Sequence, residues 1–193
     1  MKKKVLLGTT IAMGAVMLLR AMKTKPRKAE PIKDFDLYNY LGNWYEIARL
    51  DHRFEKHMTN VMANYSVNEQ GNVRVINSGF HLKKEKWEKA EGVAKFRGRE
   101  QEGALKVSFF GPIYEGYNII SIDDNYKYAL IAGRNLEYLW ILSREKTIPQ
   151  NIKNNYLKLA ELIGYNISRL TWVTHDRQSP FENKEALFGK DES

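Results

Sequence analysis

The chain has 193 residues, of which 43% are hydrophobic and none is cysteine, so it can bury a sizeable core but cannot form disulfides, thiolate metal sites or a cysteine nucleophile. Its formal net charge is +8, but nine of the 31 basic and one of the 23 acidic residues lie in residues 1–33, which leaves 22 of each sign in residues 34–193. This balance argues against a nucleic-acid partner, because nucleic-acid-binding proteins concentrate basic residues on the folded domain itself.

The first 33 residues have the pattern of a membrane-targeting segment. Lys2 to Lys4 precede an uncharged apolar run of 15 residues, 5–19. The run predicts an N-terminal hydrophobic helix, and residues 1–22 are then either a cleaved signal peptide or an uncleaved membrane anchor. A basic tether with two prolines extends to residue 33, and it is either a solvated linker or a contact for anionic lipid head groups.

From residue 34 onward the chain alternates between short apolar segments and polar turns. Segments with strand character cover residues 44–50, 61–67, 73–75, 91–96, 105–109, 117–122, 126–131 and 138–142. Eight such segments at a spacing of about 10–15 residues predict an antiparallel sandwich or an up-and-down barrel.

One helix follows these strands. Thr147 and Gln150 have the spacing of a capping box, which predicts that the helix begins at Thr147. Four apolar residues at spacings of four, three and four form one face, and Gly164 predicts the end of the helix. The face consists of Ile152, Tyr156, Leu159 and Ile163. A last strand is expected over residues 170–173.

Three motifs occur in the order that is typical of a known family. Gly42-Asn43-Trp44 begins the first strand, Asp123-Asp124-Asn125-Tyr126 is a looser match at a turn, and Arg144 follows the eighth strand. With the helix after Arg144, residues 34–175 resemble the lipocalins, in particular the bacterial outer-membrane lipocalins and apolipoprotein D. The resemblance implies an all-β fold: an eight-stranded antiparallel up-and-down barrel over residues 34–176, with a C-terminal α-helix and a short final strand, between the N-terminal hydrophobic helix and a tail over residues 177–193.

The resemblance also assigns the two ends of the barrel. It implies a closed end plugged by Trp44, with the guanidinium of Arg144 stacked on the indole within ~6 Å and Gly42 allowing a close turn beneath it. The connections around residues 51–60, 82–88, 110–116 and 133–137 are expected to surround the open mouth.

The candidate site residues belong to the inner face of this barrel. Tyr65, Trp140 and Asn77 match positions that line the pocket in apolipoprotein D, and Val75 shares the face of Asn77 by the period of two. Val107 and Phe109 lie on the apolar face of their strand, and Tyr117 is a further candidate. Arg53, in a mouth loop, is the candidate for a negatively charged head group. The alternatives are a tightly packed core without a cavity and a solvated loop charge.

Catalytic and metal-binding motifs are absent from the sequence, so we expect no enzyme, cofactor or metal site. Four histidines lack a ligand spacing, and Asp123-Asp124 lies in a turn, where Asp is favoured for backbone reasons. Glu46 shares the strand face of Trp44, so it is expected to point inward and to need a polar partner.

These features predict a protein that binds, stores or transports a fatty acid or lysophospholipid at the bacterial cell envelope, in a membrane that faces the periplasm or in the outer membrane. Bacterial lipocalins are anchored through an acylated cysteine, which this chain lacks, so lipoprotein anchoring is excluded here and residues 5–22 are the expected attachment. A homodimer is left open. The alternatives are a non-catalytic interaction module with a vestigial cavity and an enzymatic lipocalin.

Overall fold

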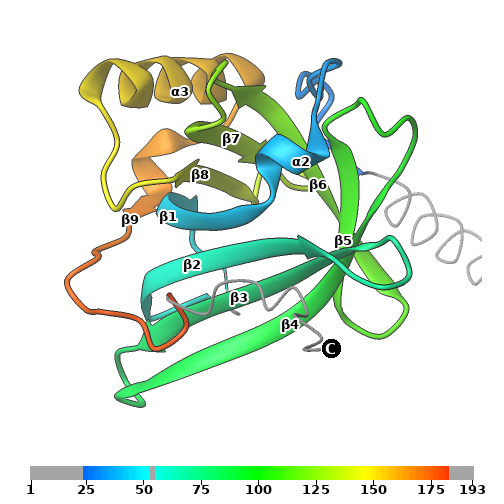
Figure 1. Ribbon diagram of the computed structural model, residues 1–193. Coiled ribbons are helices and arrows are strands. Elements are labelled where there is room, and N and C mark those ends of the chain that lie inside the picture. Colours follow the sequence, from blue (N-terminus) through cyan, green and yellow to red (C-terminus); the bar gives the residue numbers. More distant parts are fainter. Residues whose placement is uncertain (1–23, 53–54, 183–193) are drawn as a thin grey trace, which may run out of the picture.

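The computed structural model describes residues 24–52 and 55–182, so the predicted N-terminal helix and Arg53 lie outside the described residues. The strands are β1 Gly42–Leu50, β2 Met58–Val67, β3 Val73–His81, β4 Lys86–Phe96, β5 Ala104–Phe110, β6 Ile113–Ile122, β7 Tyr128–Ala132, β8 Leu139–Ser143 and β9 Leu170–Trp172. The helices are α2 Leu37–Tyr40, α3 Gln150–Ile163 and the 3-10 turn η1 Ile167–Arg169. In the described residues these strands form one antiparallel sheet that curls into a barrel (Figure 1).

Strand β1 closes the barrel because it pairs with three other strands. Its first half pairs with β2, from Gly42 opposite Tyr65 onward, and its middle pairs with β8. Its last residues, including Leu50 opposite Leu170, pair with the short β9. The expectation of eight barrel strands with a helix and a short final strand is confirmed, and closure leaves no exposed edge between β1 and β2.

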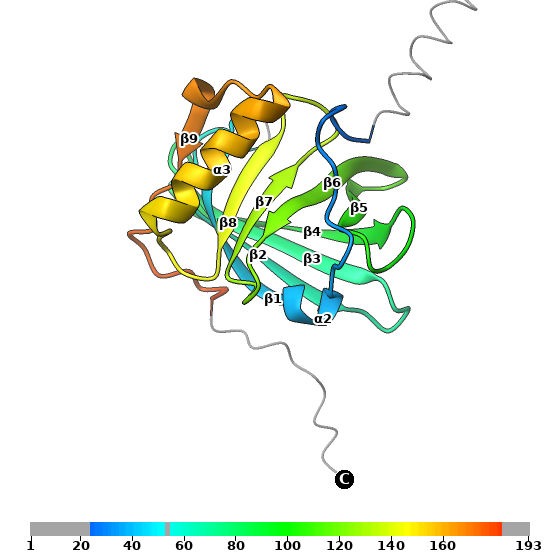
Figure 2. The ribbon, with the colours of Figure 1, turned by 90° about the horizontal axis from the view of Figure 1, so that it is seen from above.

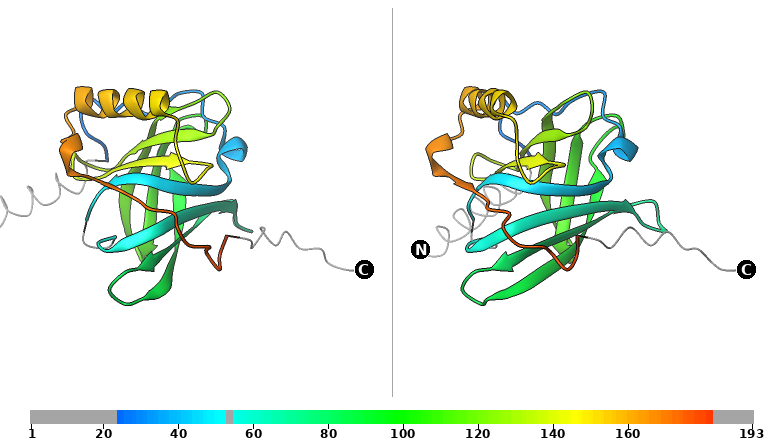
Figure 3. Two further views of the ribbon diagram at one scale, coloured as in Figure 1. Left: turned by 90° about the vertical axis from the view of Figure 1, so that its left-hand side faces the viewer. Right: turned by 60° about the vertical axis from the view of Figure 1, so that its left-hand side comes forward.

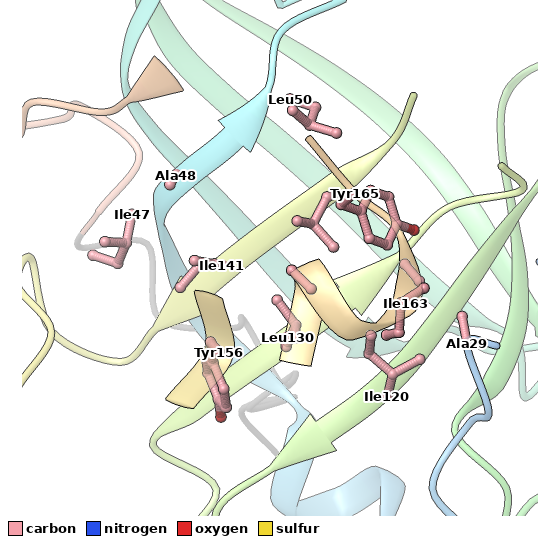
Figure 4. Close-up of a cluster of buried hydrophobic side chains, with 13 residues drawn as sticks. Ala29, Ile47, Ala48, Leu50, Ile120, Leu130, Ile141, Tyr156, Ile163 and Tyr165 are labelled. Carbon is pink, nitrogen blue, oxygen red and sulfur yellow. The ribbon is translucent and has the colours of Figure 1, made fainter. Parts of the chain in front are cut away.

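The strand alternation separates two apolar layers. One layer fills the barrel interior around Trp44, and the other lies between the outer face of β7 and β8 and the helix α3. Tyr156 and Ile163 of α3 lie over Leu130 and Ile141 of the sheet (Figure 4), and Figure 2 shows the helix crossing this face. The helix thus covers the outside of the barrel and does not contribute to the interior layer.

The predicted start of the helix is wrong and the predicted end is right. The helix begins at Gln150 with Pro149 as its extended N-cap residue, and no side chain caps it. Pro149 disfavours a helical conformation at the preceding residue, so the helix cannot run back to Thr147. Thr147 instead offers its carbonyl to the Ser143 hydroxyl at 2.8 Å. At the other end Gly164 takes a left-handed conformation with φ of 113°.

The turn before β7 is longer than the sequence predicted. The Asp123 carboxylate accepts backbone hydrogen bonds from Asn125, Lys127 and Tyr128 at 3.2, 2.7 and 2.6 Å. Tyr126 is left-handed, with φ of 53°, so the strand begins only at Tyr128. Asp123 therefore has a structural role in this turn.

Residues 24–36 lie against the barrel as a strap. The Ile32 N–H donates to the Ile119 carbonyl at 2.9 Å, the Gly103 N–H donates to the Ile32 carbonyl at 2.8 Å, and Ala29 is fully buried. The strap leads into α2, whose first turn is capped by the Asp36 carboxylate. Figure 3 shows it running along the outside of the barrel from α2 to the opposite end. The described part of the predicted tether is thus packed on the domain.

The described C-terminal residues also pack on the barrel. The Arg177 guanidinium lies 4.1 Å from the Phe80 ring centroid, and Lys146 forms an ion pair with Glu182 at 2.9 Å. Among residues 24–52 and 55–182, no helix has the length and apolar character needed to cross a membrane.

The closed end is held by Arg144. Its Cζ lies 3.9 Å from the ring centroid of Trp44, which is fully buried and donates its own N–H to the Tyr40 carbonyl. The guanidinium also donates to four backbone carbonyls: Asn43 at 2.7 Å, Asn39 at 2.8 Å, Tyr40 at 3.1 Å and Tyr126 at 3.2 Å. One side chain therefore joins α2, β1 and the turn before β7.

Gly42 is required where the chain turns toward this arginine. Its φ of +92° is unfavourable for other residues, and a Cβ there would lie 3.4 Å from Arg144 Nη1. The predicted stacking of Arg144 on Trp44 is therefore present, with Gly42 next to it.

We expect the substitution Arg144→Ala to lower the free energy of unfolding by about 3 kcal/mol, because it removes the stacking and leaves several carbonyls without their charged donor. Urea denaturation of the full chain measures this. The control is Arg169→Ala, which removes an exposed pair with Glu137 and should cost less than about 1 kcal/mol. Equal effects of the two substitutions would contradict this role of Arg144.

Candidate ligand site inside the barrel

Most of the predicted site residues come together on the inner face of the barrel. Tyr65, Val75, Val107, Phe109, Tyr117 and Trp140 all belong to the apolar cluster around Trp44. Asn77 is opposite Ala63 and shares the face of Val75 on β3. The structure thus gathers these residues from β2, β3, β5, β6 and β8 around one interior.

Accessibility to solvent changes along the barrel interior. Near the closed end Trp44 and Ile119 are 0% exposed, and Leu105 is 4% exposed. Toward the mouth the inward-facing residues Val107, Phe109 and Trp140 are only half-buried. Ala63 and Asn77 are half-buried as well, and they lie deeper, where Ala63 pairs with Trp44 and with Asn77. The interior is therefore packed at one end and accessible at the other.

Three tyrosine hydroxyls form a chain above the closed end. The Tyr117 hydroxyl lies 2.6 Å from that of Tyr40 and 2.7 Å from that of Tyr65. Burial raises the pKa of Tyr65 to about 12 and the pKa values of Tyr40 and Tyr117 well above their ordinary value, so all three keep their protons. Three hydroxyls carry three protons and the two contacts use two, so within the described residues one proton is available to a further acceptor.

The amide oxygen of Asn77 is a second polar feature of the interior. Oδ1 is buried without a hydrogen-bond partner among the described residues. A buried carbonyl oxygen normally has a partner, so this atom can accept a hydrogen bond from a molecule in the barrel.

A bulge in β1 places two charged side chains on the same inner face of the barrel. The pairing with β8 shifts between Glu46, opposite Leu142, and Ala48, opposite Ile141. The extra residue, Ile47, points to the outer layer, and its carbonyl accepts the Val173 N–H at 2.9 Å. Because of this extra residue, Glu46 and Arg49 lie on the same face instead of on opposite faces. The polar partner expected for Glu46 is Arg49, whose Nη1 lies 2.7 Å from Glu46 Oε1.

Arg49 is the centre of a buried charge network near the mouth. It is 1% exposed and also contacts the Asp51 carboxylate at 2.9 Å and the Glu55 carbonyl at 2.7 Å. Glu55 accepts the indole N–H of Trp140 at 3.2 Å and lies 3.0 Å from His52 Nε2. Since the Glu55 carboxylate also lies 3.9 Å from Arg49 Nε, three carboxylates surround one guanidinium, and Trp140 is hydrogen-bonded to one of them.

Glu46 is the most deeply buried carboxyl of this network, with an exposed fraction of 4%. Desolvation, followed by the repulsion of Glu55, raises the pKa of Glu46 to about 8 against the lowering effect of Arg49. The carboxyl therefore exchanges its proton close to neutral pH.

The comparisons with known proteins agree with this geometry. The family model described as a lipocalin-like domain matches residues 35–175. The chain belongs to the lipocalin family. It is 47% identical over 150 residues to the outer membrane lipoprotein Blc of Citrobacter freundii, covering 78% of this chain and 85% of the relative.

The chain is also similar to a more distant sequence relative and, in fold, to a solved structure. Apolipoprotein D of Rattus norvegicus is 33% identical over 125 residues, covering 61% of this chain and 65% of the relative. The solved structure of insecticyanin from the tobacco hornworm Manduca sexta superposes with a TM-score of 0.62 at 22% identity, covering 80% of this chain and 87% of that chain. Lipocalins are typically carriers of small hydrophobic molecules, which agrees with a half-open apolar interior.

Sequence reasoning missed two residues of this candidate site. Arg49 was missed because strict alternation places it on the outside, and only the bulge turns it inward. Tyr40 was missed because it lies in the short helix α2 before the first strand, although its hydroxyl completes the tyrosine chain. The inward-facing Glu46 could have predicted an inward-facing Arg49, because a buried carboxylate requires a cation nearby.

Features outside the barrel interior offer less chemistry. A hollow of about 260 Å³ lies between α3 and β6 beside Tyr156, and another of about 450 Å³ lies beside Trp87 and Pro180. The first is lined by Asp123 and Tyr156, but Asp123 caps its own turn and the Tyr156 hydroxyl donates to the Tyr128 carbonyl at 2.8 Å. The second has no titratable side chain among its lining residues. In the described part of the chain no three metal-ligand side chains converge. The barrel interior is therefore the candidate site.

The raised pKa of Glu46 predicts how stability depends on pH. Because the folded state holds a proton that the unfolded state releases near 4.5, the stability should fall as pH rises from about 4.5 to about 8, by at most ~1.4 kcal/mol per unit. The substitution Glu46→Gln removes the titrating group and keeps an acceptor for Arg49, so this decline should flatten. Urea unfolding between these pH values measures it, and an unchanged slope in the variant would contradict the assignment.

Proposed function

We propose that this lipocalin binds, stores or carries a fatty acid or lysophospholipid in its barrel at the bacterial cell envelope. The observation that carries the proposal is the change in exposure along the interior: a packed end around Trp44, and half-buried apolar side chains such as Val107 and Phe109 toward the mouth. A tube that is closed at one end and apolar along its wall suits a molecule with a long alkyl chain.

The driving force is burial of the alkyl chain. Each methylene group removed from water contributes ~0.8 kcal/mol, so a long chain overcomes the entropy lost on association. Val75, Val107 and Phe109 supply apolar contacts, and the half-buried indole of Trp140 lies closer to the mouth. These are the side chains that we expect to touch the alkyl chain.

Polar groups then determine the position of the ligand. Near the mouth the polar groups are the indole of Trp140 and the network of Arg49 and Glu55. Nearer the closed end they are the tyrosine chain and Asn77. The contact of Arg53 with a negatively charged head group stays a prediction. A single-chain lipid with one polar head satisfies these groups better than a purely apolar molecule, since a buried polar atom needs a partner.

The proposed location is a membrane of the cell envelope. The Citrobacter relative is named an outer membrane lipoprotein, which supports an envelope location. This chain has no cysteine to carry a lipid, so we propose attachment through residues 5–22, in the outer membrane or in a membrane facing the periplasm. The barrel acts as a carrier in this proposal and performs no reaction.

Calorimetric titration of the purified full chain with oleate and with lysophosphatidylethanolamine tests the proposal. We expect saturable binding of at least one of them, with a negative heat-capacity change from apolar burial. Absence of saturation with both ligands in a folded protein would refute the proposal and favour an interaction module with a vestigial cavity.

The substitution Trp140→Ala should weaken binding of the better ligand about tenfold, because the indole contributes apolar contact worth ~1.5 kcal/mol. Trp172→Ala is the matched control, since Trp172 lies on β9, is 43% exposed and contacts Lys153 outside the barrel. The same titration measures both variants. Unchanged affinity for Trp140→Ala, or an equal loss in the control, would remove Trp140 from the site.

A further inference from the structure

Large exposed hydrophobic side chains gather at the mouth end of the barrel. Of the seven in the described residues, Tyr38 lies on α2 and Trp172 on β9. The other five are Leu82, Phe110, Ile113, Leu136 and Leu162, and Ile113 is 69% and Leu162 63% exposed. Apolar side chains gathered at one end of a molecule indicate a contact surface.

These five residues come from separate elements around the mouth. Leu82 lies in the β3–β4 turn, and Phe110 pairs with Ile113 at the tip of the β5–β6 hairpin. Leu136 lies between β7 and β8, and its Cδ1 is 3.6 Å from where a Cβ would stand at Gly164, just after Leu162 at the end of α3. Three of the mouth connections and the end of α3 therefore each present exposed apolar side chains, and we call these five residues the apolar rim.

The strap brings the N-terminal part of the chain to the same end. The Thr24 carbonyl accepts from Asn118 Nδ2 at 2.8 Å, and the same amide donates to the Ala132 carbonyl at 2.9 Å, where β7 leaves the barrel toward the mouth. Lys28 Nζ lies 3.4 Å from the Leu162 carbonyl. Figures 2 and 3 show the start of the strap at the end opposite α2.

We propose that the apolar rim docks on an anionic lipid bilayer, so that the mouth of the barrel opens at the membrane surface. The apolar run ends at Leu19, five residues before Thr24, and a fully extended chain of that length spans about 18 Å. Attachment of this run to a membrane therefore holds the mouth end, and not the closed end, next to the bilayer. This step rests on the proposed membrane attachment.

The form and charge of the surface favour a bilayer over a protein partner. The rim consists of tips on separate elements, which a fluid bilayer can accommodate one by one, whereas a protein partner requires a continuous complementary face. The strap adds Lys25, Arg27 and Lys28 at the same end, of which Lys25 pairs with Glu30 at 2.6 Å. Arg27 and Lys28 are exposed and suit anionic head groups, because a basic residue near an anionic membrane surface is attracted to it.

This orientation deepens the proposed function. A single-chain lipid leaving the bilayer would enter the barrel between Trp140 and the apolar rim without exposing its alkyl chain to water. The tyrosine chain at the far end would then lie farthest from the membrane.

Fluorescence quenching in vesicles tests the orientation. Because the chain has no cysteine, a single cysteine substitution allows one thiol-reactive fluorophore to be attached at a chosen position. The substitutions are Leu82→Cys or Ile113→Cys at the mouth, and Glu69→Cys or Asp124→Cys at the closed end. The full chain is reconstituted in vesicles of phosphatidylethanolamine and phosphatidylglycerol that contain a nitroxide-labelled lipid. We expect severalfold stronger quenching at the two mouth positions. Equal or stronger quenching at the closed end, or no quenching at any position, would overturn the proposal.

A second measurement separates the rim from the attachment. The double substitution Leu82→Ser and Ile113→Ser should lower the quenching of a label at Leu136→Cys severalfold, while Tyr38→Ser, which removes an exposed aromatic at the closed end, should leave it unchanged. Equal effects would contradict docking through the rim. Calorimetric lipid binding by the same variants should persist, so failure of the docking proposal and failure of lipid binding give different results.

Discussion

The fold depends on the stacking of Arg144 over Trp44. A barrel built from consecutive hairpins has two open ends, and one of them must be closed by side chains if it is to hold a ligand. Here a buried indole fills the end, and one guanidinium satisfies backbone carbonyls of α2, β1 and the turn before β7. Because these carbonyls come from three parts of the chain, the cation fixes where α2 covers the barrel. Tyr40 of α2 then packs 4.9 Å from the indole, and its hydroxyl reaches Tyr117.

The same strand that supplies Trp44 also supplies the charges near the mouth. One extra residue in β1 turns Arg49 inward, where it meets Glu46, Asp51 and the Glu55 carbonyl. A buried ion pair contributes little net stability, since desolvation offsets the attraction. Through the partly exposed Glu55 the network holds the indole of Trp140, so the position of a candidate ligand contact depends on the buried Arg49.

The sequence was sufficient for the barrel and for part of its interior. The motif residues Gly42, Trp44 and Arg144 identified the closed end of the barrel. The alternation of apolar and polar residues within β2, β3 and β5 identified Tyr65, Val75 and Val107 as inward-facing, because a period of two is preserved where strands pair without interruption. Gly164 marked the helix end, since its left-handed conformation is a local property of one residue.

Other structural features depend on contacts between distant residues or on backbone hydrogen bonds, which local sequence patterns do not predict. The inward turn of Arg49 follows from a register shift against β8, and the late start of α3 follows from the restriction that Pro149 imposes on its neighbour. The strap over residues 24–36 looked like a tether, because its charged and proline-rich composition hides the backbone hydrogen bonds of Ile32 and the burial of Ala29.

The central claim is that the half-open interior holds the alkyl chain of a lipid. A crystal structure of the protein with a brominated fatty acid tests it most directly, because anomalous scattering locates the bromine atoms independently of the protein atoms. The account predicts bromine inside the barrel, against Val107, Phe109 and Trp140. Bromine found only in the outer hollows beside Tyr156 or Trp87, with none in the interior, would contradict it.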